Sequence, residues 1–443
     1  MAKVLISYFG LEENKKSIFF ESFIDSLIEQ GNEVLYLNTT GFLEKAWNGN
    51  NELKENIQVD ELLDDIRKFS PELCITFNNS IPSAIVNMLD IPIIIWHADT
   101  FMYFNDKDRL KSDPGRYFYV CPFERDIKTL KKELSVSSDK ILNILPATSV
   151  KSELLDQDLN ISFIGSLFQY HGFPEKLRDV QNRGEIIKAY NITKSDPLAD
   201  IEEIGQQLLS QHALESFSHD DLIDFSSIQD RNMTLASLYD LGMTLYGKSP
   251  YFDWLSIGQF LPGLGLCVSD EDVYTLKHNQ DIYNRSRVSV SISHSQAAEG
   301  FPWRVFDVMA SNSCLLSDKR QGIADFTKGY VDIPMFSDPF EARKLAKVLL
   351  GSEELRNQII QGSNACIEDK GRWHHRFRDI GEAIGVSLIN KESSMVGSSQ
   401  QIFSSDFILV NKASERIIEL QRKYHNKIII RKTLSLYKRM MKL

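Results

Sequence analysis

Short apolar segments alternate with longer segments of helical periodicity over the first 150 residues. In chain order these apolar segments are KVLISYF, EVLYLNT, ELCITFN, IPIIIWH, YFYVCPF and ILNILPA. Runs rich in Val, Ile, Phe and Tyr that are separated by helices are typical of βαβ units around a buried parallel sheet. Residues 1–150 are therefore predicted to form a Rossmann-like α/β domain.

The same alternation restarts near residue 158 and continues to about 390. Its apolar segments are LNISFIGS, GMTLYGK, GLCVSD, SVSISHS, CLLSD and YVDIPMF. A second Rossmann-like domain is predicted over 158–390, after the polar linker TSVKSELLDQD, with a helical insertion at about 175–235. Ligands of such sheets bind outside the carboxyl ends of the strands, so a ligand is expected in the cleft between the two domains.

The chain after residue 390 changes in character. Residues 391–443 are predicted to be a Ser-rich linker followed by a basic tail, in which 427–443 contain six Lys or Arg and no acid. Apolar residues among cations are typical of a helix on an anionic membrane surface. The alternative is a helix packed against the protein's own acidic surface.

Composition narrows the choice of partners and compartment. A net charge of -11 gives no overall electrostatic reason to bind nucleic acid. The five cysteines form no CxxC pair, which favours a reducing cytoplasm. No signal-peptide layout and no apolar run of ~18 residues is present, so we expect a cytoplasmic protein, peripheral at the inner face of the membrane if the tail binds there.

The segment AEGFPWRVFDVMASNS carries the strongest candidate chemistry. Gly300 permits close approach of the backbone to a ligand, and Pro302 suits a first helical position, so N–H groups at this helix start are expected to hold a phosphate. Glu299 precedes the helix and Asp307 follows eight residues later. The alternative is an ordinary helix with an Arg304–Asp307 surface ion pair and a solvated Glu299.

This spacing resembles the Glu-x7-Glu motif of GT-B glycosyltransferases, and GFPWRVFD, with Phe301 and Arg304, resembles the branch similar to spore-maturation (CgeB-like) proteins. The resemblance implies that Glu299 lies beside the donor sugar and that Asp307 holds the ribose hydroxyls. The segment ISFIGSLF resembles the first strand of the donor domain, where Gly165 and Ser166 open the loop over the pyrophosphate. This chain departs from the family by having Asp as its second acid and Ser-Asn-Ser in place of Ala-Cys-Gly.

Three further polar residues are expected to face the cleft. His97 and Asp99 follow the run IPIIIW and would orient an acceptor hydroxyl or act as a general base. The alternative is a loop acid that caps a turn, with a histidine packed on Trp96. Lys248 follows a strand and a glycine and, like Arg304, would offset charge on a leaving nucleoside diphosphate.

Other charged motifs are expected to be structural. Arg285 and Arg287 are interpreted as loop or lid charges. Asp270-x-Asp272 is expected to be a solvated turn rather than a metal site. The pair His374-His375 has no partners at zinc-ligand spacing and is expected to be partly exposed beside Trp373, a helix anchor.

Together these features predict a GT-B glycosyltransferase that moves a sugar from a nucleotide-sugar donor to a glycan or lipid-linked glycan acceptor in cell-surface polysaccharide or glycoconjugate synthesis. Resemblance to the Glu-x7-Glu enzymes implies retention of configuration. No metal or other cofactor is expected, because N–H groups with Arg or Lys would stabilise the leaving charge. The alternatives are a sugar-nucleotide epimerase of the same fold and an inactive glycan- or nucleotide-binding scaffold.

Overall fold

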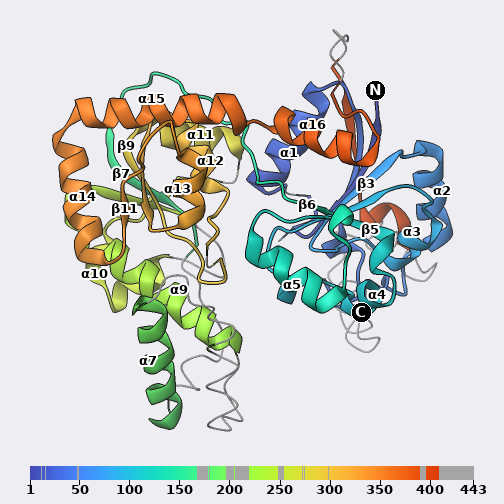
Figure 1. Ribbon diagram of the computed structural model, residues 1–443, viewed down its shortest axis with the longest axis horizontal. Helices are drawn as coiled ribbons and strands as arrows, with labels where there is room; N and C mark the ends of the chain where they lie inside the picture. Colours follow the sequence, from blue (N-terminus) through green and yellow to red (C-terminus); the bar gives the residue numbers. More distant parts are fainter. Residues whose placement is uncertain are drawn as a thin grey trace, which may run out of the picture.

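The protein has two α/β domains, each built on a parallel sheet (Figure 1). The structure is a computed structural model. It describes residues 1–10, 12–14, 16–46, 49–166, 178, 180–195, 204, 219–247, 254–271, 273, 275–297, 299–389 and 396–408.

The first sheet has seven strands in the order β12-β2-β1-β3-β4-β5-β6. Its strands are β1 (Lys3–Tyr8), β2 (Glu33–Asn38), β3 (Leu73–Phe77), β4 (Ile93–Trp96), β5 (Tyr117–Val120), β6 (Ile141–Leu142) and β12 (Ser398–Ile402). All pairings are parallel, and β3 and β4 are buried along their whole length. Helices cover both faces of the sheet, so its central strands are buried on both sides and read as nearly continuous apolar runs in the sequence.

Each face of this sheet has its own hydrophobic core. One face packs against α1 (Ile18–Glu29) and α16 (Trp373–Ile384). The other packs against α2 (Val59–Phe69), α3 (Ser83–Met88), α4 (Lys107–Ser112) and α5 (Glu124–Leu134).

The second sheet has five strands in the order β11-β10-β9-β7-β8, and all its pairings are parallel. Its strands are β7 (Leu159–Ile164), β8 (Met243–Tyr246), β9 (Ser286–Ser291), β10 (Cys314–Asp318) and β11 (Met335–Phe336). Its helices are α7 (Val180–Ser195), α9 (His219–Ala236), α10 (Pro262–Gly265), α11 (Leu276–Arg285), α12 (Arg304–Met309), α13 (Gln321–Thr327), α14 (Pro339–Gly351) and α15 (Glu353–Lys370). Two Rossmann-like domains are thus confirmed. Helices α7 and α9, which project from the second domain in Figure 1, lie in the predicted insertion.

The chain passes between the domains twice, and the second passage differs from the sequence prediction. Helix α15 ends at the second domain, and α16 packs back on α1 of the first domain (Figure 1). Strand β12 then pairs with β2. Residues 373–389 therefore lie with the first domain rather than with 158–390, and 398–402 form an edge strand rather than a linker.

Strand β12 reads as a linker in the sequence because it is polar, and it is polar because it lies at the exposed edge of the sheet. Strand β12 has the sequence SSQQI, and its first three residues are exposed. Such a strand shows no run of apolar residues, since only one side of it meets the sheet. The basic tail at 427–443 lies outside the described residues. None of the helices that the structure describes is long and apolar enough to cross a membrane.

Candidate active site

A cavity of about 670 Å³ lies between the two domains. The first domain lines it with residues 17–19 at the start of α1, 97–100 after β4, and 122, 123, 125 and 126 after β5. The second domain lines it with 164–166 after β7 and most of 294–307 after β9. These segments follow the carboxyl ends of parallel strands, which is where such sheets bind ligands.

Arg304 brings a positive charge to the wall of the second domain. Its guanidinium carbon lies 5.3 Å from the centre of the Phe163 ring. Its Nη1 is buried and has no hydrogen-bond partner in the part of the chain that the structure describes. A buried donor of this kind costs free energy unless a ligand satisfies it. Arg304 is therefore suited to bind an anion, rather than to form a surface ion pair.

Gly165 and Ser166 directly follow β7 and line the cavity. A Cβ at Gly165 would lie 3.0 Å from Nη2 of Arg304, so glycine leaves room for the guanidinium. The Gly165 carbonyl accepts from Trp254 Nε1 at 2.8 Å, and the Ser166 carbonyl accepts from Arg231 Nη1 at 2.7 Å. The loop is thereby held in place. Lys248 lies outside the described residues.

The segment Glu299–Phe301 meets the start of α5 across the domain interface. Glu299 Oε1 accepts a hydrogen bond from the backbone N–H of Arg125 at 2.7 Å. A Cβ at Gly300 would lie 2.5 Å from the Phe123 ring, and the Phe301 ring packs edge-on against the same ring. Gly300 thus permits close approach of the other domain, and Phe301 belongs to the hydrophobic core of the second domain. Both still line the cavity.

The start of α12 offers fewer N–H groups than expected. The N–H of Val305 donates to the Pro302 carbonyl, and the next two N–H groups donate to the Trp303 carbonyl. The helix has only six residues. The helix start therefore leaves few N–H groups for an anion, and Arg304 is a cationic side chain beside it.

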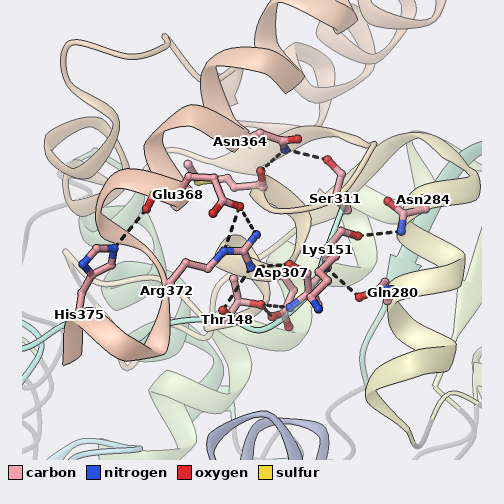
Figure 2. Close-up of polar contacts among 12 residues, drawn as sticks. Thr148, Lys151, Gln280, Asn284, Asp307, Ser311, Asn364, Glu368, Arg372 and His375 are labelled. Atoms are coloured by element: carbon pink, nitrogen blue, oxygen red, sulfur yellow. Dashed lines mark hydrogen bonds and ion pairs between the residues drawn. The ribbon is translucent and has the colours of Figure 1, made fainter. Parts of the chain in front are cut away.

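Asp307 lies on α12, lines the cavity and faces the interdomain linker (Figure 2). Its Oδ1 accepts from Thr148 Oγ1 at 2.6 Å. Burial raises the pKa of Asp307 to about 6, although the Thr148 hydroxyl, Arg304 and Arg372 each favour the ionised form. Near pH 7 Asp307 is therefore an anion that is only partly hydrated and is stabilised by these neighbours.

His97 lies at the end of β4 and is 2% exposed. Neither of its ring nitrogens has a hydrogen-bond partner among the residues that the structure describes, and the ring packs edge-on against Phe104. Burial lowers the pKa of His97 to about 3. The imidazole is thus neutral near pH 7 and better suited to hydrogen-bond a hydroxyl than to take up a proton.

Asp99 is held by amide groups from both domains. Asn78 Nδ2 donates to its Oδ2 at 2.7 Å, and Gln296 Nε2 donates to its Oδ1 at 3.1 Å. Asn78 Oδ1 also accepts from the N–H groups of Ala98 and Asp99 at 2.9 and 3.0 Å. A carboxylate has about four lone-pair positions, so Asp99 retains capacity for an acceptor hydroxyl.

Several residues of the cavity wall were not expected from the sequence, among them Asp126, Arg125, Gln296 and His294. Burial raises the pKa of Asp126 to about 6, Arg125 opposes this shift, and Glu299 adds to it. Burial lowers the pKa of His294 to about 3, with smaller effects of Arg231 and Arg320. The sequence could have indicated these residues by their position, because they come shortly after the strands β5 and β9.

Arg285 and Trp373, two residues expected to be structural, lie outside the cavity wall, and Asp272 lies outside the described residues. Arg285 forms two hydrogen bonds with Asp158, at 2.9 and 2.8 Å, outside the cavity wall. Trp373 is buried at the start of α16 and donates to Ser22 Oγ at 2.7 Å, which confirms the helix anchor. Within the described residues, no group of three or more His, Cys, Asp and Glu side chains could hold a metal ion.

One family model matches part of this chain. Residues 231–382 match the model of a glycosyl transferase-like family, and the match includes Glu299, Arg304 and Asp307. A search of curated proteins finds no match.

Several solved structures are similar to this chain. Sucrose-phosphate synthase from Thermosynechococcus elongatus has a TM-score of 0.50 at 9% identity, covering 86% of this chain and 98% of that one. Anabaena HepE in complex with UDP-glucose has a TM-score of 0.47 at 9% identity, covering 87% and 100%. A putative UDP-N-acetylglucosamine 2-epimerase from Listeria monocytogenes has a TM-score of 0.44 at 9% identity, covering 89% and 98%. The likeness to the synthase confirms the GT-B fold, and the family match supports glycosyltransferase activity.

Proposed function

We propose that this protein transfers a sugar from a nucleotide-sugar donor, held mainly by the second domain, to a glycan or lipid-linked glycan acceptor on the first. The observation that carries the proposal is Arg304, which has a buried, unsatisfied Nη1 in an interdomain cavity and lies within the glycosyl transferase-like match. We further propose that the protein belongs to the branch of transferases similar to spore-maturation proteins. Its role would be in cell-surface polysaccharide or glycoconjugate synthesis.

In the proposed reaction, the bond between the anomeric carbon and the donor diphosphate breaks, and a bond to an acceptor oxygen forms. The acceptor hydroxyl gives its proton to the departing diphosphate oxygen, so the second product is the nucleoside diphosphate. Arg304 stabilises the negative charge that develops on the leaving diphosphate. Lys248, which lies outside the described residues, is the second candidate for this role. Asp307 binds the ribose hydroxyls, and the loop at Gly165 and Ser166 covers the diphosphate.

On the acceptor side, the neutral His97 hydrogen-bonds a sugar hydroxyl, and Asp99 orients the reacting one. We propose retention of configuration with Glu299 beside the donor sugar, and the anomeric form of the product, read by NMR, tests this. We also propose that transfer needs no metal, because a fixed guanidinium can neutralise the diphosphate. Full activity in EDTA is the expected result.

The first test is a thermal-shift panel of UDP, GDP, ADP, CMP and dTDP, with and without magnesium. A nucleotide at 100 times its Kd stabilises the fold by about 2.7 kcal/mol, so one member of the panel should raise Tm clearly. Arg304→Gln should weaken this nucleotide by about 10- to 100-fold, since hydrogen bonds to charged groups contribute about 1.5–3 kcal/mol.

Arg285→Gln is the matched control, since Arg285 is a cation of the same domain outside the cavity wall. It should leave the nucleotide-induced shift unchanged. A wild-type protein that no nucleotide stabilises would contradict the proposal, as would an Arg304→Gln variant that binds normally. Conversion of the donor sugar without any acceptor would identify an epimerase instead.

A further inference from the structure

The chain passes between the domains twice, and hydrogen bonds join the two passages beside Asp307 (Figure 2). The first passage contains Thr148, and the second contains Gly371 and Arg372. The N–H of Thr148 donates to the Gly371 carbonyl at 3.1 Å, and Thr148 and Arg372 form an isolated parallel bridge. The linker and the α15–α16 connection are therefore one structural unit.

The side chain of Arg372 adds further hydrogen bonds between the two passages. Its Nη1 donates to the carbonyls of Thr148, at 3.3 Å, and Val150. Its Nε donates to Glu368 Oε1 at 3.1 Å, and its Nη2 contacts the same oxygen, so the guanidinium is anchored to the end of α15. The side chain of Arg372 is only 15% exposed.

The hydroxyl of Thr148 has a defined orientation. It accepts a hydrogen bond from the N–H of Val150 at 3.0 Å. Its single proton is then directed at Asp307 Oδ1, 2.6 Å away. A hydroxyl that donates to a carboxylate favours the ionised form and fixes the plane of that carboxylate.

We propose that Thr148 is a positioning residue, which holds the Asp307 carboxylate in place for the ribose of the nucleotide and so ties donor binding to the interdomain linker. This inference rests on the proposed function, because it takes the nucleotide as the ligand of Asp307. No substrate need contact Thr148 itself.

The charged groups around Asp307 set the pH dependence that follows. Arg304 lies on the same helix, Arg372 faces Asp307 from the second passage and is paired with Glu368, and Tyr283 of α11 contributes a neutral hydroxyl. With its pKa raised to about 6, Asp307 becomes ionised as the pH rises through 6. Ribose hydroxyls donate hydrogen bonds, so nucleotide affinity should rise over the same range.

The test compares Thr148→Val with Thr148→Ser by calorimetric titration between pH 5 and 8, using the nucleoside diphosphate that stabilises the wild type. Valine has nearly the same shape but no hydroxyl, so Kd should rise about tenfold or more. The midpoint of the pH profile should also move to higher pH, because the hydrogen bond that favours ionised Asp307 is gone. Serine should restore both properties.

Two controls separate this role from a purely structural one. A 2′,3′-dideoxy analogue of the same nucleotide lacks the ribose hydroxyls and should bind wild type and Thr148→Val equally. Asp307→Asn should retain only the pH dependence of the nucleotide's own phosphate, whose second pKa is also about 6.

The outcomes distinguish the two proposals. If no nucleoside diphosphate binds the wild type, the proposed function fails, and the role of Thr148 fails with it. If the wild type binds and Thr148→Val has the same Kd and the same pH profile, only the role of Thr148 is overturned. A Thr148→Val variant that weakens the dideoxy analogue to the same extent would also overturn it, because the loss would then come from the linker and not from the ribose contact.

Discussion

At the scale of single residues, the cleft holds two acids, Asp126 and Asp307, whose pKa values burial raises to about 6. Their neighbours differ. Asp307 receives a hydrogen bond from Thr148 and has two opposing cations, Arg304 and Arg372. Asp126 has one opposing cation, Arg125, and a like charge in Glu299. An acid that is harder to ionise in the folded state destabilises the fold wherever it is charged. Asp126 therefore lowers stability at neutral pH, and such a cost is typical of a functional site.

Replacing Asp126 by Asn should stabilise the protein at pH 7.5 and leave its stability almost unchanged near pH 3.5. Folding raises the pKa of Asp126 from 3.8 to about 6, so the folded state binds more protons than the unfolded chain between these values. Stability is consequently lost as the pH rises through this window. At 1.36 kcal/mol for each pKa unit, reduced for partial exposure, the gain at pH 7.5 should be on the order of 1–2 kcal/mol. Tm measured against pH checks this.

Glu124→Gln is the matched control, because Glu124 lies in the same first turn of α5 but is exposed. It should show no comparable gain at pH 7.5. A stabilisation by Asp126→Asn that is equally large at pH 3.5 and 7.5 would mean that packing, and not the charge, is responsible.

The sequence was sufficient to predict residues of the site but not their hydrogen-bond partners. Glu299 and Asp307 follow from the spacing of one motif, and His97 and Asp99 from their position after a strand. Their partners come from other elements: the N–H of Arg125 is 174 residues from Glu299, and Thr148 is 159 residues from Asp307. Local pattern carries no information about such pairs, because the relative placement of two domains brings them together.

At the scale of elements, the last described strand completes the first domain. Ile402 at the end of β12 and Phe407 after it are both 5% exposed and belong to the core beneath α2. The N–H of Gln58 donates to the Phe407 carbonyl at 2.7 Å, and Ser404 Oγ donates to Glu13 Oε2 at 2.7 Å. These contacts hold an otherwise polar segment on the edge of the sheet.

A chain that ends at residue 395 should therefore be less stable than one that ends at 408, by about 3–6 kcal/mol. The estimate counts two buried side chains at about 1.5–3 kcal/mol each. The shorter chain also exposes the edge of β2, so it should aggregate more readily. Thermal unfolding and light scattering of the two chains measure both effects. Equal Tm values would show that β12 adds nothing to the stability of the domain.

At the scale of the whole molecule, direct contacts hold the two domains around the cavity in addition to the two chain passages. Glu299 bonds to the start of α5, Gln296 to Asp99, and Glu21 Oε2 accepts from the N–H of Leu276 at the start of α11 at 2.9 Å. Periodicity was sufficient to predict both domains, since their central strands are continuous apolar runs. It could not predict that α16 and β12 return to the first domain, because an apolar helix face and a polar edge strand do not specify which sheet they join.

We propose that the basic tail binds an anionic membrane surface. Residues 427–443 carry six cations and no acid in a chain with a net charge of -11. Near an anionic membrane surface each cation contributes about 1 kcal/mol, and added salt screens this attraction. We expect the full chain to sediment with phosphatidylserine-containing vesicles at low salt and to be released at high salt. A chain that ends at 426 should stay in solution, and neither chain should bind phosphatidylcholine vesicles. Replacing Ile428, Ile429 and Ile430 by Ser keeps the charge, so weaker binding of this variant would show that apolar insertion contributes as well. A full chain that binds no vesicle would favour a tail packed on the protein's own acidic surface, and the acceptor would then have to reach the cleft without a membrane anchor on the enzyme.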